Sequence, residues 1–136
     1  MLLVSVWLYC IAALGAAVLG LRYLLGPVPA GYHAEILNRD RVEQPEGLRL
    51  VLTALYRVTG GAILGAALAI CLLAFGLTPG APLGVAMAPA LVGLFMGLPG
   101  VLLPWNVEKA TGVRTPWRLS AVLSGIVALA FLLSIL

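Results

Sequence analysis

The sequence predicts an all-α integral membrane protein, with four transmembrane helices in an up-down bundle and a short interfacial helix in the first loop. Apolar residues make up 62% of the 136 residues and charged residues only 10%, whereas soluble domains carry about 25% charged residues. The chain also contains four apolar stretches of about 20 residues, the length that crosses the hydrocarbon core of a bilayer. This composition excludes a soluble domain, a disordered segment and a nucleic-acid-binding module.

The whole chain, residues 1–136, is predicted to be a single membrane domain. Its expected spans cover residues 2–24, 49–77, 82–104 and 117–136. Basic and aromatic residues typical of a membrane interface stand at the ends of these spans. Arg22 and Tyr23 close the first span, Trp105 follows the third, and Trp117 and Arg118 open the fourth.

The distribution of basic residues predicts the orientation of the chain. All 8 Lys and Arg residues lie in or beside the connections 25–48 and 105–116, and the other side of the predicted bundle carries none. Because positively charged loops stay in the cytoplasm, we expect both connections to be cytoplasmic loops. The N- and C-termini are then periplasmic, and the expected location is a bacterial inner membrane. A cleavable signal peptide is disfavoured, since no basic residue precedes the first apolar run.

The first connection is the only long one. Pro27 and Pro29 favour an extended entry, and Ala30–Arg41 is predicted to form a short surface helix. Tyr32 and Ile36 are four residues apart, so they share one side of that helix. We expect this side to lie on the bilayer surface, where the helix would cap the bundle.

Small residues spaced four apart predict close packing of the spans. In lipid, helices associate where small residues let their backbones approach, because the surrounding acyl chains are as apolar as the helices themselves. Every predicted span carries such a set: Ala13/Ala17, Ala16/Gly20, Gly61/Gly65/Ala69, Gly93/Gly97, Ser120/Ser124 and Ala121/Gly125. The short Thr78–Ala81 turn also makes the second and third spans antiparallel neighbours.

Two features of the spans are candidate functional sites. Pro99 and Gly100 predict a break near the cytoplasmic end of the third span, because proline removes a backbone hydrogen bond and bends a helix. Transporters often build substrate sites at such breaks, and a purely structural kink is the alternative. Arg57 either reaches the interface beside Tyr56 or is buried, in which case it needs an acid such as Glu46.

His33 and Glu35 in the first loop raise the possibility of a general base or a metal site. Residues two apart on a helix point away from each other. A metal site needs three or four ligands, whereas the chain has one His and two Cys. Cys10 and Cys71 fall inside apolar spans and are expected to be buried free thiols. We therefore predict that the protein is not an enzyme and has no catalytic residue, metal or cofactor. Among the alternative functions, a lipid-modifying enzyme is the least favoured.

Three segments resemble a known group of proteins: Tyr32–Glu35, Ala54–Gly61 at the entry to the second span, and Thr111–Trp117 at the entry to the fourth. In the order of its elements the chain resembles small four-span bacterial membrane proteins of unknown function, similar in layout to the DoxX-like proteins. The Thr111–Trp117 segment alone is similar to a Gly-Ile-Arg-Thr-Pro-Trp stretch of the SdpI-like immunity proteins. The resemblance implies a four-helix membrane fold and transfers no catalytic or binding residue.

The predicted function is a non-enzymatic membrane protein that acts through helix contacts, either as an accessory or assembly subunit or as a homo-oligomer. Its expected partners are the lipid bilayer and another membrane protein or a second copy of the chain, and no nucleic acid. The rival interpretation is a transporter or channel for a small solute or an anion. That passage would use the broken third helix and a basic cytoplasmic mouth formed by Arg22, Arg57, Arg114 and Arg118.

Overall fold

The computed structural model describes all residues 1–136 and contains helices and no strand. The five helices are α1 (Leu2–Leu25), α2 (Tyr32–Arg39), α3 (Glu46–Phe75), α4 (Leu83–Thr111) and α5 (Trp117–Ile135). α1, α3, α4 and α5 are each long and apolar enough to cross a membrane. The expected spans thus correspond to four helices, and the short helix expected within Ala30–Arg41 is α2.

The largest difference from the expected boundaries lies at the end of the third span. This span was expected to stop at residue 104, yet α4 continues to Thr111 with Pro104 inside it. Gly112 ends the helix by adopting a left-handed conformation with φ 70°, and its N–H donates a hydrogen bond to the carbonyl of Glu108. Glycine adopts this conformation without steric cost. The stop signal is therefore Gly112, and Pro104 does not end the helix.

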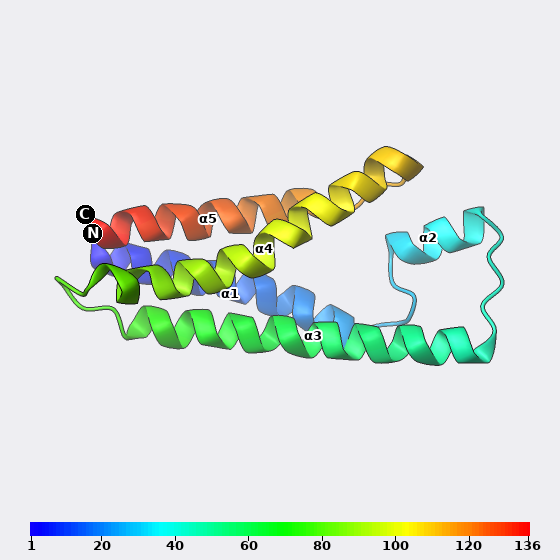
Figure 1. Cartoon of the computed structure of the whole chain (residues 1–136), viewed down its shortest axis with the longest axis horizontal. Coiled ribbons are helices and arrows are strands. Elements are labelled where there is room, and N and C mark those ends of the chain that lie inside the picture. The colour runs from blue at the N-terminus through cyan, green and yellow to red at the C-terminus, as the bar shows by residue number, and fades with distance from the viewer.

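The two ends of the chain and the α3–α4 turn lie together at one end of the molecule (Figure 1). The connection that contains α2 and the α4–α5 connection lie at the other, which we call the charged end. All 8 Lys and Arg residues belong to the segments at that end: Arg22, Arg39, Arg41, Arg49, Arg57, Lys109, Arg114 and Arg118. α1 packs against α3 and α5, and α4 packs against α5 and α3, so the long helices form a closed ring.

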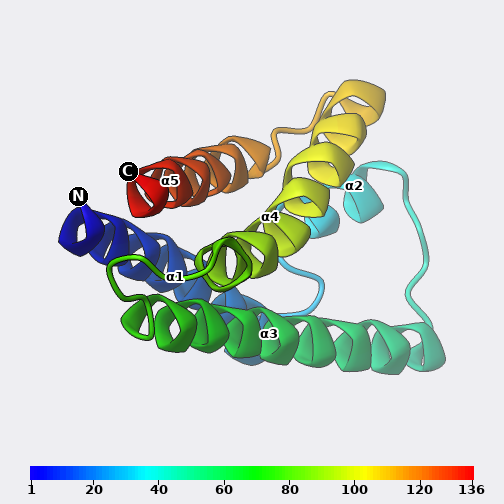
Figure 2. The same ribbon diagram turned by 60° about the vertical axis from the view of Figure 1, so that its left-hand side comes forward.

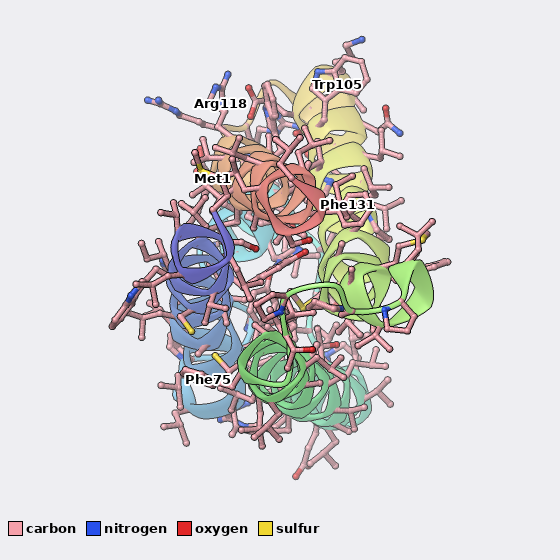
Figure 3. The ribbon with its side chains drawn as sticks, turned by 90° about the vertical axis from the view of Figure 1, so that its left-hand side faces the viewer. Met1, Phe75, Trp105, Arg118 and Phe131 are labelled. Atoms are coloured by element: carbon pink, nitrogen blue, oxygen red, sulfur yellow. The ribbon has the colours of Figure 1, made fainter.

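Small apolar residues from all four long helices form the centre of the bundle. The buried core consists mainly of alanines, among them Ala12 and Ala16 of α1, Ala74 of α3 and Ala130 of α5. Ser5 is fully buried, and its hydroxyl donates a 2.7 Å hydrogen bond to the carbonyl of Ala130. An end-on view shows the four long helices arranged around a common centre into which side chains project (Figure 3). Small side chains therefore allow the helix backbones to approach closely.

The closest approach of a glycine to the backbone of another helix involves Gly60, which the small-residue pattern missed. A Cβ atom at Gly60 would lie 2.5 Å from the backbone nitrogen of Leu24, whereas one at Gly61 or Gly65 would meet nothing within 4 Å. The expected Gly61/Gly65/Ala69 set therefore does not form the contact with α1. Gly20, from the predicted Ala16/Gly20 pair, does take part, since a Cβ there would lie 3.1 Å from the carbonyl oxygen of Gly60.

Candidate functional site

The candidate functional residues fall into four places in the structure. His33 and Glu35 lie on α2, Arg57 lies on α3 near the charged end, and Arg114 lies in the α4–α5 connection. Pro99 and Gly100 lie within α4. Of these residues, only His33 and Arg57 make side-chain hydrogen bonds to other helices.

His33 belongs to a cluster of four rings that joins α2 to the ends of α1 and α3. Its ring centroid lies 3.9 Å from that of Tyr32 and 5.6 Å from that of Tyr56. Tyr23 completes the cluster at 5.2 Å from Tyr56. The backbone N–H of Ala30 donates to the Tyr56 hydroxyl at 3.2 Å, and that hydroxyl is 2.5 Å from His33 Nδ1. With Nδ1 unprotonated, the Tyr56 hydroxyl donates to it, and the cluster fixes α2 against the bundle.

Burial controls the protonation of this cluster. Desolvation lowers the pKa of His33, so the neutral imidazole that accepts from Tyr56 is the favoured form. Burial and the neighbouring Tyr23 raise the pKa of Tyr32, whose hydroxyl therefore stays protonated. Glu35 is exposed and makes no side-chain hydrogen bond, so it does not meet His33. A His–carboxylate pair of the kind that serves as a general base is not formed here.

Arg57 contacts the end of α1. Its Nη1 donates to the carbonyl of Leu24 and, at 3.4 Å, to the carbonyl of Tyr23. The last carbonyls of a helix lack partners within the helix and carry partial negative charge. The guanidinium of Arg57 therefore caps α1, and it forms no ion pair. The acid proposed as its partner in a buried position, Glu46, is not needed.

The α4–α5 connection is held by a carboxylate that the sequence reasoning passed over. Glu108 accepts hydrogen bonds from the Thr115 backbone N–H at 2.9 Å and from Arg118 Nη2 at 2.8 Å. The Thr115 hydroxyl donates to the carbonyl of Pro104 at 2.9 Å. Glu108 is the one acid between the third and fourth predicted spans. Its place among the basic residues there was the sequence signal that it could pair with one of them.

Aromatic and basic side chains surround this connection. The rings of Trp105 and Trp117 lie 6.5 Å apart, with Lys109 Nζ 3.7 Å from the centre of the first ring and Arg118 Cζ 4.7 Å from that of the second. Trp105 and Arg118 project from the same side of the molecule in the end-on view (Figure 3). Arg39, at the end of α2, donates to the carbonyl of Thr111. The Thr111–Trp117 segment is thus tied to both neighbouring helices and to α2.

Pro99 and Gly100 do not break α4. The helix continues through both, and also through Pro89 and Pro104, and it bends away from α3 toward the charged end (Figure 2). A cavity of about 90 Å³ lies beside the bend, between α4 and the other three long helices. Small groups make up much of its lining, including Gly97, Gly100, Ser120 and Ser124. The predicted break is a bend in a continuous helix.

Metal-binding side chains do not gather anywhere in the structure. No group of three or more His, Cys, Asp or Glu residues lies together, and Cys10 and Cys71 are free and only partly buried. The groups available to a ligand at the charged end are basic side chains, aromatic rings and backbone groups. No protein-family model, no curated protein and no solved structure matches this chain.

Proposed function

We propose that this chain is a multi-pass protein of a bacterial inner membrane that acts through helix contacts, as an accessory or assembly subunit of a larger membrane complex. The observation that carries the proposal is a stripe on the outer face of α3. Gly61 and Gly65 leave open space there, and exposed apolar side chains continue the line at 3- and 4-residue intervals: Val58, Leu68 and Leu72.

This stripe has the form of a surface for another transmembrane helix. The intervals between its residues match the 3- and 4-residue spacing at which the side chains of two packed helices interdigitate. Two glycines one turn apart let a partner backbone approach closely, the main source of helix association in lipid. Within the chain, α1 and α4 pack on other faces of α3 and leave this stripe uncovered.

In this proposal the bundle is up-down, the charged end faces the cytoplasm, and both termini lie outside. The positive-inside tendency supports this orientation, since all 8 basic residues belong to one end. α2 then lies at the cytoplasmic surface, where Tyr32 and Ile36 contact the interface. The resemblance to DoxX-like proteins stays a prediction, and so does the absence of enzymatic activity.

The test compares complexes formed by the wild type and by stripe variants. We expect native mass spectrometry from nanodiscs to detect the wild-type chain bound to a second polypeptide. The double variant Gly61→Leu/Gly65→Leu should appear without that polypeptide. Gly125→Leu is the matched control, because its Cβ position on α5 is also open, and it should keep the partner. If the wild type appears only as a homo-oligomer, the chain acts through self-association and not as an accessory subunit. If it appears only as a monomer, the proposal is overturned.

A second candidate is the passage for a small solute or an anion. The cavity beside Pro99 and the basic charged end favour it. Against it, no charged side chain is buried in the bundle, and the buried polar groups are few, among them the hydroxyls of Ser5, Tyr9 and Ser124, so the interior offers little to replace a solute's water. Flux into liposomes that falls in Pro99→Ala and Arg57→Ala would favour the passage, and absence of flux from the wild type would remove it.

A further inference from the structure

A cavity of about 330 Å³ opens at the charged end, between α1, the start of α2 and the α4–α5 connection. Arg22 and Arg114 line it from two different elements, and Tyr23 and Tyr32 contribute aromatic walls. Leu19, one turn before Tyr23 on α1, supplies an apolar part of the lining. Cationic, aromatic and aliphatic groups therefore face one space. This volume falls at the lower end of the range of about 300–1,000 Å³ typical of ligand pockets.

The arginines of this cavity differ from most others at the charged end because their hydrogen-bonding groups are unused. Arg57 donates to α1 carbonyls, and Arg118 and Arg39 are paired with Glu108 and Asp40. In contrast, Arg22 and Arg114 make no ion pair and no side-chain hydrogen bond. Two guanidinium groups with free donors therefore line the same cavity, where their charges repel unless an anion lies between them.

The neighbouring groups leave the positive charge of the cavity intact. The carboxylate of Glu108, near the end of α4, is engaged by Arg118 and by the backbone of Thr115, a residue of the cavity lining. Burial keeps the hydroxyl of Tyr32 protonated, as its raised pKa shows, so this side chain can donate but carries no negative charge. An anion with several acceptor oxygens suits such a set of donors.

The level of the cavity in the bundle indicates the source of that anion. Its aromatic residues belong to a belt at the charged end that also includes Tyr56, Trp105 and Trp117, and such belts lie at the level of lipid headgroups. Apolar helix surface begins immediately beyond, at Leu19 and Leu21 of α1. A molecule bound here would have its charge between the arginines and its hydrocarbon beside α1.

We propose that this cavity binds the phosphate of an anionic phospholipid, held by Arg22 and Arg114, with its acyl chains against the outer surface of the bundle. Arginine is suited to this role because its planar fork can donate two parallel hydrogen bonds to phosphate oxygens. The lipid phosphate would link α1, which carries Arg22, to the α4–α5 connection, which carries Arg114. The inference does not depend on the α3 stripe or on a protein partner.

The experiment titrates phosphatidylglycerol into delipidated, detergent-solubilised protein and counts bound lipid by native mass spectrometry. We expect the wild type to bind phosphatidylglycerol more tightly than phosphatidylcholine. Arg22→Gln/Arg114→Gln should weaken phosphatidylglycerol binding about tenfold or more, since hydrogen bonds to a charged group are lost. Arg22→Lys should fall in between, because lysine keeps the charge and loses the fork.

The matched control is Arg49→Gln, which removes one exposed, unpaired arginine at the same end but outside the cavity. It should bind as the wild type does. If the control loses as much phosphatidylglycerol affinity as the cavity variants, the effect is general charge attraction, and the proposed site is wrong. Wild-type binding by the double variant would also overturn the site, provided that circular dichroism and elution volume show that it is folded.

A final arm separates lipid from free phosphate. Sodium phosphate is compared with sodium chloride at equal ionic strength as a competitor of bound phosphatidylglycerol. We expect the two salts to act alike, because the acyl chains add affinity that inorganic phosphate lacks. Specific displacement by phosphate would assign the cavity to a free anion and overturn the lipid assignment.

Discussion

The carbonyl oxygen of Gly20 on α1 lies 2.7 Å from the position that a Cβ atom would take at Gly60 on α3. The same Cβ would be 2.5 Å from the backbone nitrogen of Leu24. These neighbours are backbone atoms of a helix, so they cannot rotate away as the end of a side chain can. The α1–α3 contact therefore depends on glycine at position 60.

Gly60→Ala is expected to destabilise the bundle by about 1–3 kcal/mol, the usual cost of forcing a methyl group into a closely packed site. Thermal unfolding in detergent, followed by circular dichroism, measures the change. Gly61→Ala is the control, because its Cβ would meet nothing within 4 Å. Equal stability of the two variants would show that α1 and α3 do not approach each other at Gly60.

Arg57→Ala should cost about 1–3 kcal/mol of stability, because it removes the charge-assisted hydrogen bonds to the carbonyls of Leu24 and Tyr23. Hydrogen exchange should show earlier fraying of the last turn of α1. Arg49→Ala is the control, because Arg49 is an exposed basic residue on the same helix. If unfolding of Arg57→Ala follows the wild type, the guanidinium reaches lipid headgroups rather than α1.

Glu108→Ala should loosen the α4–α5 connection. Its carboxylate accepts from the Thr115 amide and from Arg118, and without it both donors turn to water. We expect hydrogen exchange of residues 112–116 to accelerate several-fold, while the middle of α5 keeps its protection. Glu43→Ala removes an exposed acid that forms no ion pair and should leave this connection unchanged. Unaltered exchange in Glu108→Ala would show that Thr115 is held by other contacts.

Lowering the pH should loosen α2. Burial puts the pKa of His33 in the folded protein below its unfolded value of about 6.5. The neutral ring therefore adds stability above about pH 6.5, and this contribution is lost as the pH falls from there through the folded pKa. Protonated Nδ1 can no longer accept from Tyr56. Proteolysis within residues 40–45 should rise at low pH in the wild type.

The control for this pH effect is His33→Gln, which cannot titrate. Its proteolysis within residues 40–45 should be nearly independent of pH between about pH 7 and pH 5, the range in which histidine changes charge. If proteolysis of His33→Gln rises with falling pH as steeply as that of the wild type, the effect belongs to another group. Tyr56→Phe keeps the ring and removes the hydroxyl, so it should raise proteolysis already at neutral pH.

Most of the fold could be predicted because its signals are local in the sequence. Runs of apolar residues marked the four long helices, and the prolines before Ala30 marked the entry to α2. The prediction was wrong at the end of α4, where Pro104 looked like a terminus. A proline in a membrane helix is tolerated when nearby groups satisfy the freed backbone, and the helix continues to Thr111, just before Gly112.

The contacts between helices could not be predicted in the same way. Spacing of small residues selected Gly61, whereas the rotation of α3 about its axis places Gly60 against α1. The partner of Arg57 is a backbone carbonyl, a group that every residue carries and that no sequence pattern marks. The pairing of Glu108 with Arg118 likewise depends on how α4 and α5 meet.

The three prolines inside α4 also make the four long helices unequal in stiffness. Pro89, Pro99 and Pro104 each remove one intrahelical hydrogen bond, whereas α1, α3 and α5 contain no proline. Elastic bending of the bundle therefore concentrates in α4. Since α4 already diverges from α3 at the charged end (Figure 1), we expect the separation of these two helix ends to change more easily than the other helix separations of the bundle. Lateral pressure in the membrane leaflet around the charged end would act first on that separation.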